Sequence, residues 1–76
     1  MPRFYFHKHI NGQTMPDRRG ILLRNKGEAC AHAVRCTPLT LRTLAKSRKN
    51  THLAWEVSDG ERRIFVVRGK LLIEEC

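Results

Sequence analysis

The fold is decided by the stretch HLAWEVSDGERRIFVVR, which spans residues 52–68. Its first half alternates apolar and polar side chains, and its second half is rich in branched and aromatic residues, as β-strands are. Between the two halves, Asp59-Gly60 is a strong signal for a tight two-residue turn. The stretch therefore predicts an antiparallel hairpin of residues 52–58 and 61–68.

A two-residue turn also fixes which residues of this hairpin share a face of the sheet. The pairs expected on the face that meets a helix are Leu53–Val66, Trp55–Ile64 and Val57–Arg62. The pairs expected on the opposite, outer face are Glu56–Arg63, Ala54–Phe65 and His52–Val67. This assignment decides which side chains a partner meets.

The N-terminal region predicts a second hairpin. Residues 3–10 alternate as a strand does, and Asn11-Gly12 favours a hairpin turn because both residues accept positive φ. Residues 13–16 make a weak return strand that Pro16 ends, and residues 21–23 a brief extended segment. The side chains expected on the core face are Phe4, Phe6 and Ile10, and those expected on the outer face are Arg3, Tyr5, His7 and His9.

A helix is expected between the two hairpins, from Asn25 to about Lys49. Asn25 is a good N-cap, and Glu28 three residues later completes a capping box. At about 100° per residue, one side of this helix is apolar and the opposite side is cationic. The expected apolar side comprises Cys30, Val34, Thr37, Leu41, Leu44 and Ala45. The expected cationic stripe comprises Arg35, Arg42, Lys46 and Lys49.

Pro38 lies inside this helical stretch, where a proline costs about 3 kcal/mol, so we expect a kink or a break there. The whole pattern predicts one α+β domain over residues 1–76, a short antiparallel sheet of two hairpins with one helix packed on one face. The tail, residues 71–76, begins with Leu71-Leu72-Ile73 and is apolar enough to dock on the outer face. A partner chain is the alternative cover for that face.

Composition restricts the class of protein. The chain has 76 residues, a formal net charge of +8 and a pI near 10.3. It has no run of about 20 apolar residues and no apolar leader, so we expect a cytoplasmic protein without a membrane span. Its three cysteines cannot form a fully paired disulfide framework, and we expect reduced thiols.

The opening residues Met1–His7, MPRFYFH, resemble a family of small bacterial proteins known only as a domain of unknown function. The similarity continues through Asp17 and Gly20, an alanine-rich helix around Glu28, and the hairpin at residues 55–60. The resemblance implies the fold and implies no activity. The chain departs from the family pattern in two places: it has Arg18 and Arg19 where such proteins look acidic, and Pro38 where they run an unbroken helix. Its positive charge is therefore particular to this chain.

Two functions follow from the expected surfaces. An apolar outer face predicts a protein-interaction or self-associating module, with a homodimer as one form. The expected partner surface comprises Tyr5, His7, Ala54, Phe65 and Val67. The alternative is a nucleic-acid-binding accessory protein, because the net charge is high and a cationic stripe runs along the helix. The nucleic-acid contacts would be either that stripe or the rings of the outer face.

Metal binding and catalysis have weaker support. His7 and His9 are about 6.6 Å apart on one strand face, but two ligands fall short of a closed site, so we expect no metal and no cofactor. His32 points about 160° away from Cys30 on a regular helix and cannot act as its base. No nucleophile and base can be named together, so we expect no enzymatic activity.

Overall fold

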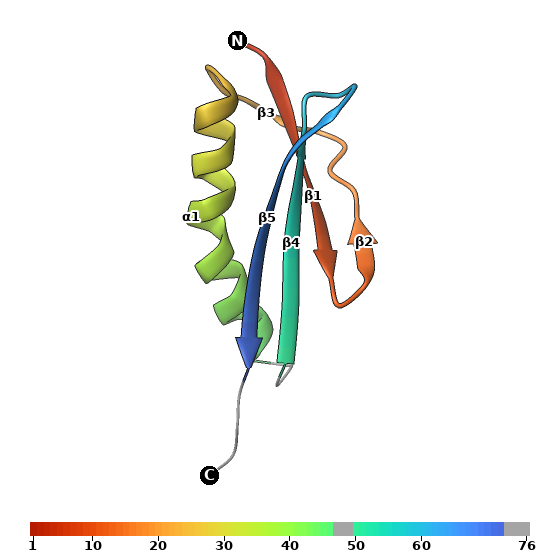
Figure 1. Ribbon diagram of the computed structural model, residues 1–76, viewed down its shortest axis with the longest axis vertical. Helices are drawn as coiled ribbons and strands as arrows, with labels where there is room; N and C mark the ends of the chain where they lie inside the picture. Colours follow the sequence, from red (N-terminus) through yellow and green to blue (C-terminus); the bar gives the residue numbers. More distant parts are fainter. Residues whose placement is uncertain (47–49, 73–76) are drawn as a thin grey trace.

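The computed structural model describes residues 1–46 and 50–72 and shows one helix packed on an antiparallel sheet (Figure 1). The elements are β1 (Arg3–Ile10), β2 (Gln13–Met15), β3 (Ile21–Leu22), α1 (Lys26–Ala45), β4 (Asn50–Ser58) and β5 (Arg63–Leu72). The sheet order is β2-β1-β4-β5, and β3 pairs with the start of β1. The α+β prediction is confirmed.

The core lies between α1 and the sheet. Phe4, Phe6 and Val57 from the strands pack against Ala29 and Ala33, the two fully buried helical residues. The small alanines let the helix approach the strands closely. Val34, expected on the apolar side, is instead 52% exposed, so the buried side of α1 is rotated from the expected one.

The start and course of α1 follow the sequence closely. The Asn25 side chain accepts a hydrogen bond from the Glu28 amide at 2.9 Å, as an N-cap should. Glu28 accepts from the Arg24 amide at 3.1 Å, one residue before the expected capping-box donor. Pro38 lies within one continuous helix, so the helix does not break there, and a kink is not confirmed.

The register of the β4–β5 hairpin differs from the predicted one by three residues. Val57 lies opposite Phe65, Trp55 opposite Val67 and Leu53 opposite Gly69. The turn contains four residues rather than two, because the Asp59 carboxylate accepts hydrogen bonds from the Glu61 and Arg62 amides. A β-bulge at Val57/Ser58 adds to the shift.

An odd shift moves every side chain of β5 to the other face of the sheet. Phe65 and Val67 therefore pack toward α1, and their predicted place on the outer face is wrong. β5 also runs on to Leu72, so Leu71 and Leu72 belong to a strand instead of a docking tail. Residues 73–76 and Lys49 lie outside the described residues.

The side chain of Asp17 binds the edge of β1 at the point between its pairing with β2 and its pairing with β3. Its Oδ2 accepts from the Phe6 amide at 3.1 Å, and its Oδ1 accepts from Arg19 and Gly20 at 3.1 and 3.2 Å. Partial burial raises the pKa of the carboxyl, but the amides of Phe6, Gly20 and Arg19 outweigh this and hold the pKa of Asp17 below its usual value. The ionised carboxylate thus replaces a neighbouring strand.

We expect Asp17→Asn to destabilise the fold by about 1–3 kcal/mol, because part of this amide cluster loses its acceptor. The folded-state pKa lies below the unfolded value of 3.8, so the stabilisation is complete above that value and is lost as the pH falls through the folded pKa. Urea unfolding at about pH 7 and between about pH 2 and 5 measures both effects. A variant as stable as the parent, or one with the same acid dependence, would contradict this role.

Candidate nucleic-acid interface

The outer face of the sheet is not covered by any of the residues 1–46 and 50–72. Its side chains follow from the strand register: His9 and Arg68 flank Ala54, and Lys70 lies opposite His52. Because Ala54 is much smaller than these neighbours, the sheet is hollowed there. The hollow is an open trough of about 610 Å³ lined by side chains of β1, β4 and β5.

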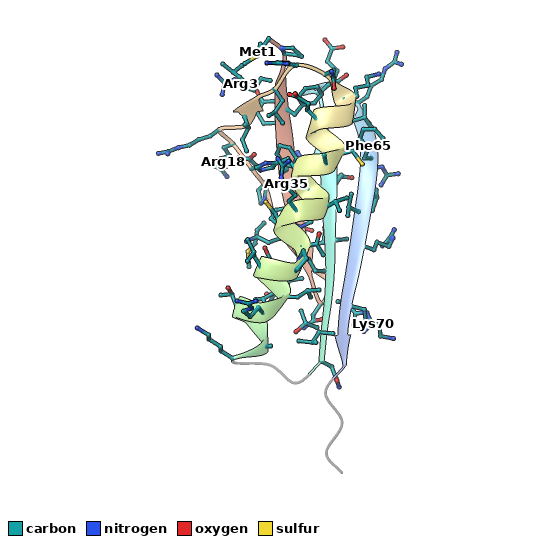
Figure 2. The ribbon with its side chains drawn as sticks, turned by 90° about the vertical axis from the view of Figure 1, so that its left-hand side faces the viewer. Met1, Arg3, Arg18, Arg35, Phe65 and Lys70 are labelled. Atoms are coloured by element: carbon teal, nitrogen blue, oxygen red, sulfur yellow. The ribbon has the colours of Figure 1, made fainter. Side chains whose placement is uncertain are left out.

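Positive charge dominates this trough. Glu56 is the carboxylate that lines it, and its oxygens lie 3.3 Å from Arg63 Nη1 and 3.8 Å from His9 Nε2. Arg68 and Lys70 have no carboxylate within ion-pair distance in the described part of the chain. They alternate along β5, so their Cα atoms are about 6.8 Å apart. Figure 2 shows Lys70 extending from β5 away from α1.

Two aromatic rings extend the face toward the start of β1. Tyr5 and His7 have ring centroids 6.4 Å apart and planes within 7° of parallel. His7 Nδ1 accepts from the Asp17 amide at 3.0 Å, which fixes the ring and leaves the proton of its neutral form on Nε2. The Tyr5 ring lies against Gly60 in the β4–β5 turn. The rings are therefore positioned before any ligand arrives.

The expected partner surface is only partly assembled. Tyr5, His7 and Ala54 lie on the outer face as predicted, whereas Phe65 and Val67 do not. The residues that replace them are Val66, Arg68 and Lys70. The exchange depends on the bulge at Val57/Ser58, because the longer turn that Asp59 caps shifts the register by two residues and alone would leave the faces unchanged.

The cationic stripe of the helix lies on the other side of the molecule. Arg35, Arg42 and Lys46 are all exposed. Figure 2 looks onto α1 with the sheet behind it and labels Arg35. Leu39 interrupts the stripe at 62% exposure. The molecule therefore presents two separate cationic surfaces.

The two candidate metal ligands already have protein partners. His7 is held by Asp17, and His9 Nδ1 lies 2.9 Å from Thr14 Oγ1 while its Nε2 faces Glu56. Within residues 1–46 and 50–72, no three His, Cys, Asp or Glu side chains gather closely enough to hold a metal ion.

One contact was missed from the sequence. His32 Nε2 lies 3.7 Å from Cys36 Sγ, one helical turn away, and the His32 ring meets the Phe6 ring edge-on at 4.9 Å. The i, i+4 spacing is the signal that would have found this pair. It lies on the helix side of the sheet, away from the trough.

A family model described as Domain of unknown function (DUF6894) matches residues 3–69. The chain belongs to this family. The DUF6894 match runs from the first residue of β1 to Gly69 in β5, so it includes Tyr5, His7 and Arg68 of the outer face. No curated protein and no solved structure matches the chain. In the described part of this DUF6894 protein, no helix has both the length and the hydropathy to cross a membrane.

Proposed function

We propose that this protein binds nucleic acid through the outer face of its sheet. The observation that supports this most is the pair Arg68 and Lys70, which border an open trough without a carboxylate partner among the described residues. A row of cations along a strand suits a polymer that carries a negative charge at every repeat. The overall charge of +8 favours the same ligand at longer range.

The outer face suits this role better than the helix stripe does. The trough gives a strand of nucleic acid a groove to lie in, and the rings of Tyr5 and His7 at its end can stack on bases. The helix stripe offers cations alone, and Leu39 interrupts them. We therefore assign nucleic-acid contact to Arg68 and Lys70 before Arg42 and Lys46.

The structure also bears on the protein-interaction role. That role was inferred from an apolar outer face, and two of its residues, Phe65 and Val67, pack toward α1 instead. The outer face keeps Tyr5, Ala54 and Val66, but Arg68 and Lys70 take the place of Phe65 and Val67, which favours nucleic acid over an apolar protein partner. The homodimer remains a prediction, and light scattering on a size-exclusion column tests it.

Fluorescence anisotropy with labelled oligonucleotides tests the proposal. We expect binding at about 50 mM salt that weakens steeply as salt rises. Three phosphates neutralised on a single strand give a log-log slope of about −2. Undetectable binding of both single-stranded and duplex oligonucleotides at about 50 mM salt would overturn the proposal.

A further inference from the structure

A second hollow lies on the opposite side of the sheet, between α1 and the β1–β2 edge. The helix makes most of its contacts with β4 and β5, and the groove opens beside it toward β2 and the segment that follows. The groove there has a volume of about 370 Å³, within the range of small-molecule sites. Its apolar lining comprises Phe6, Met15, Pro16, Ile21, Ala33 and Trp55.

Lys8 brings one positive charge into this apolar groove. It is half-buried, and its Nζ lies 5.5 Å from the centroid of the Trp55 ring. No carboxylate lies within ion-pair distance of it in residues 1–46 and 50–72. Asp17 also lines the groove, but both of its oxygens accept backbone hydrogen bonds. Among the described residues, the Lys8 ammonium therefore has no ion pair and lies over the face of the Trp55 indole ring, while the Asp17 carboxylate is held by its backbone amides.

His32 supplies a second polar group on the opposite wall. Its ring is held between the edge-on contact with Phe6 and the neighbouring Cys36 sulfur. The groove therefore combines an apolar floor with a cation on the sheet side and an imidazole on the helix side. A ligand that complements it has an apolar body and one acidic end.

We propose that this groove binds a small apolar carboxylic acid, with its carboxylate at Lys8 and its hydrocarbon part on Trp55, Met15 and Ile21. The alternative is that Lys8 only covers the Trp55 ring, as lysine stems often cover apolar surface. The two alternatives predict different ligand preferences. If Lys8 only covers the Trp55 ring, acidic and basic ligands bind the groove equally. If Lys8 binds the carboxylate, acidic ligands bind more tightly than basic ones.

Trp55 provides the readout, because it is the single tryptophan of the chain and lies in the groove. We expect octanoate to change its fluorescence saturably, and octylamine and octan-1-ol to bind at least about tenfold more weakly. Equal binding of octanoate and octylamine, or no saturable change with octanoate up to its solubility limit, would overturn the proposal.

A substitution at Met15 tests the charge of Lys8, because Met15 lies directly opposite Lys8 across the β1–β2 pair. Met15→Glu places an internal carboxylate beside the ammonium, while Met15→Gln has the same shape without the charge. Met15 is exposed, so both variants should fold, and their melting temperatures check this. We expect octanoate to bind Met15→Glu at least about tenfold more weakly than Met15→Gln.

Lys8→Met tests the same charge directly, and Lys26→Met at the exposed start of α1 is its matched control. We expect octanoate binding to be lost in the first and unchanged in the second. Met15→Glu that binds as well as Met15→Gln, or unchanged binding in Lys8→Met, would show that the lysine is a cover only. Neither result depends on nucleic-acid binding.

Discussion

Gly69→Ala is expected to lower the free energy of unfolding by about 1–3 kcal/mol. A Cβ atom at this position would lie 2.5 Å from Thr37 Cγ2 and 3.0 Å from Leu41 Cδ1, both on α1. Thr37 cannot simply rotate away, because its hydroxyl donates a 2.8 Å hydrogen bond to the Ala33 carbonyl. For a chain of this size, the loss lowers the melting temperature by about 5–20 °C.

Thr37→Ser is the matched second change, since it deletes the colliding methyl group and keeps the hydroxyl. We expect Gly69→Ala to be far less damaging in the Thr37→Ser background, and thermal unfolding of the four proteins measures this coupling. The predicted two-residue turn would have placed Gly69 on the outer face, where alanine is harmless. A neutral Gly69→Ala would therefore contradict the observed register as well as the helix packing.

Charge reversal at Arg68 and Lys70 is expected to have the largest effect on binding. Replacing both by Glu removes two phosphate contacts and adds two repulsions beside the trough. We expect oligonucleotide affinity to fall by roughly 100-fold or more at low salt, and the salt slope to lose about 0.7 units per cation on a single strand and about 0.9 on a duplex. Anisotropy titrations at several salt concentrations measure both quantities.

The matched control is the same reversal on the helix, Arg42→Glu with Lys46→Glu. It changes the net charge by the same amount, so it removes the same long-range attraction but no contact in the trough. We expect a much smaller loss from this pair. If the helix variant lost as much affinity as the β5 variant, binding would depend on overall charge or on the stripe, and the assignment to the sheet would be wrong.

Local signals in the sequence predicted most of the fold. Alternation found β1 and β4, the Asn25 N-cap found the start of α1, and Asn11-Gly12 found the first hairpin turn. These features depend on a few neighbouring residues, so they can be read directly. Pro38 was less informative, because tertiary packing can hold a helix together across a proline.

The candidate site was harder to predict, because it depends on register. Asp59-Gly60 gave the place of the turn but not its length, which the Asp59 side chain decides through the Glu61 and Arg62 amides. The longer turn shifts the register by two residues, and the one-residue bulge at Val57/Ser58 makes the shift odd, which exchanges Phe65 and Val67 for Arg68 and Lys70 on the outer face. A face expected to be apolar is thereby cationic, and the preferred ligand changes with it.

The side of α1 that faces the sheet also differs from the side predicted by hydrophobicity. Hydrophobicity favoured Val34 as a core residue, but the close approach of α1 to the strands selects the small Ala29 and Ala33. Gly69 takes part in the same close approach on the sheet side. The size of the side chains at this close contact therefore decides which side of α1 is buried. A hydropathy pattern contains no information on size.

The most direct test of the nucleic-acid interface is an NMR titration of the protein with a short single-stranded oligonucleotide. We expect the amide and side-chain signals of His9, His52, Arg68 and Lys70 to shift together, while those of Arg35, Arg42 and Lys46 stay in place. Shifts confined to α1, with the signals of β4 and β5 unchanged, would contradict this expectation.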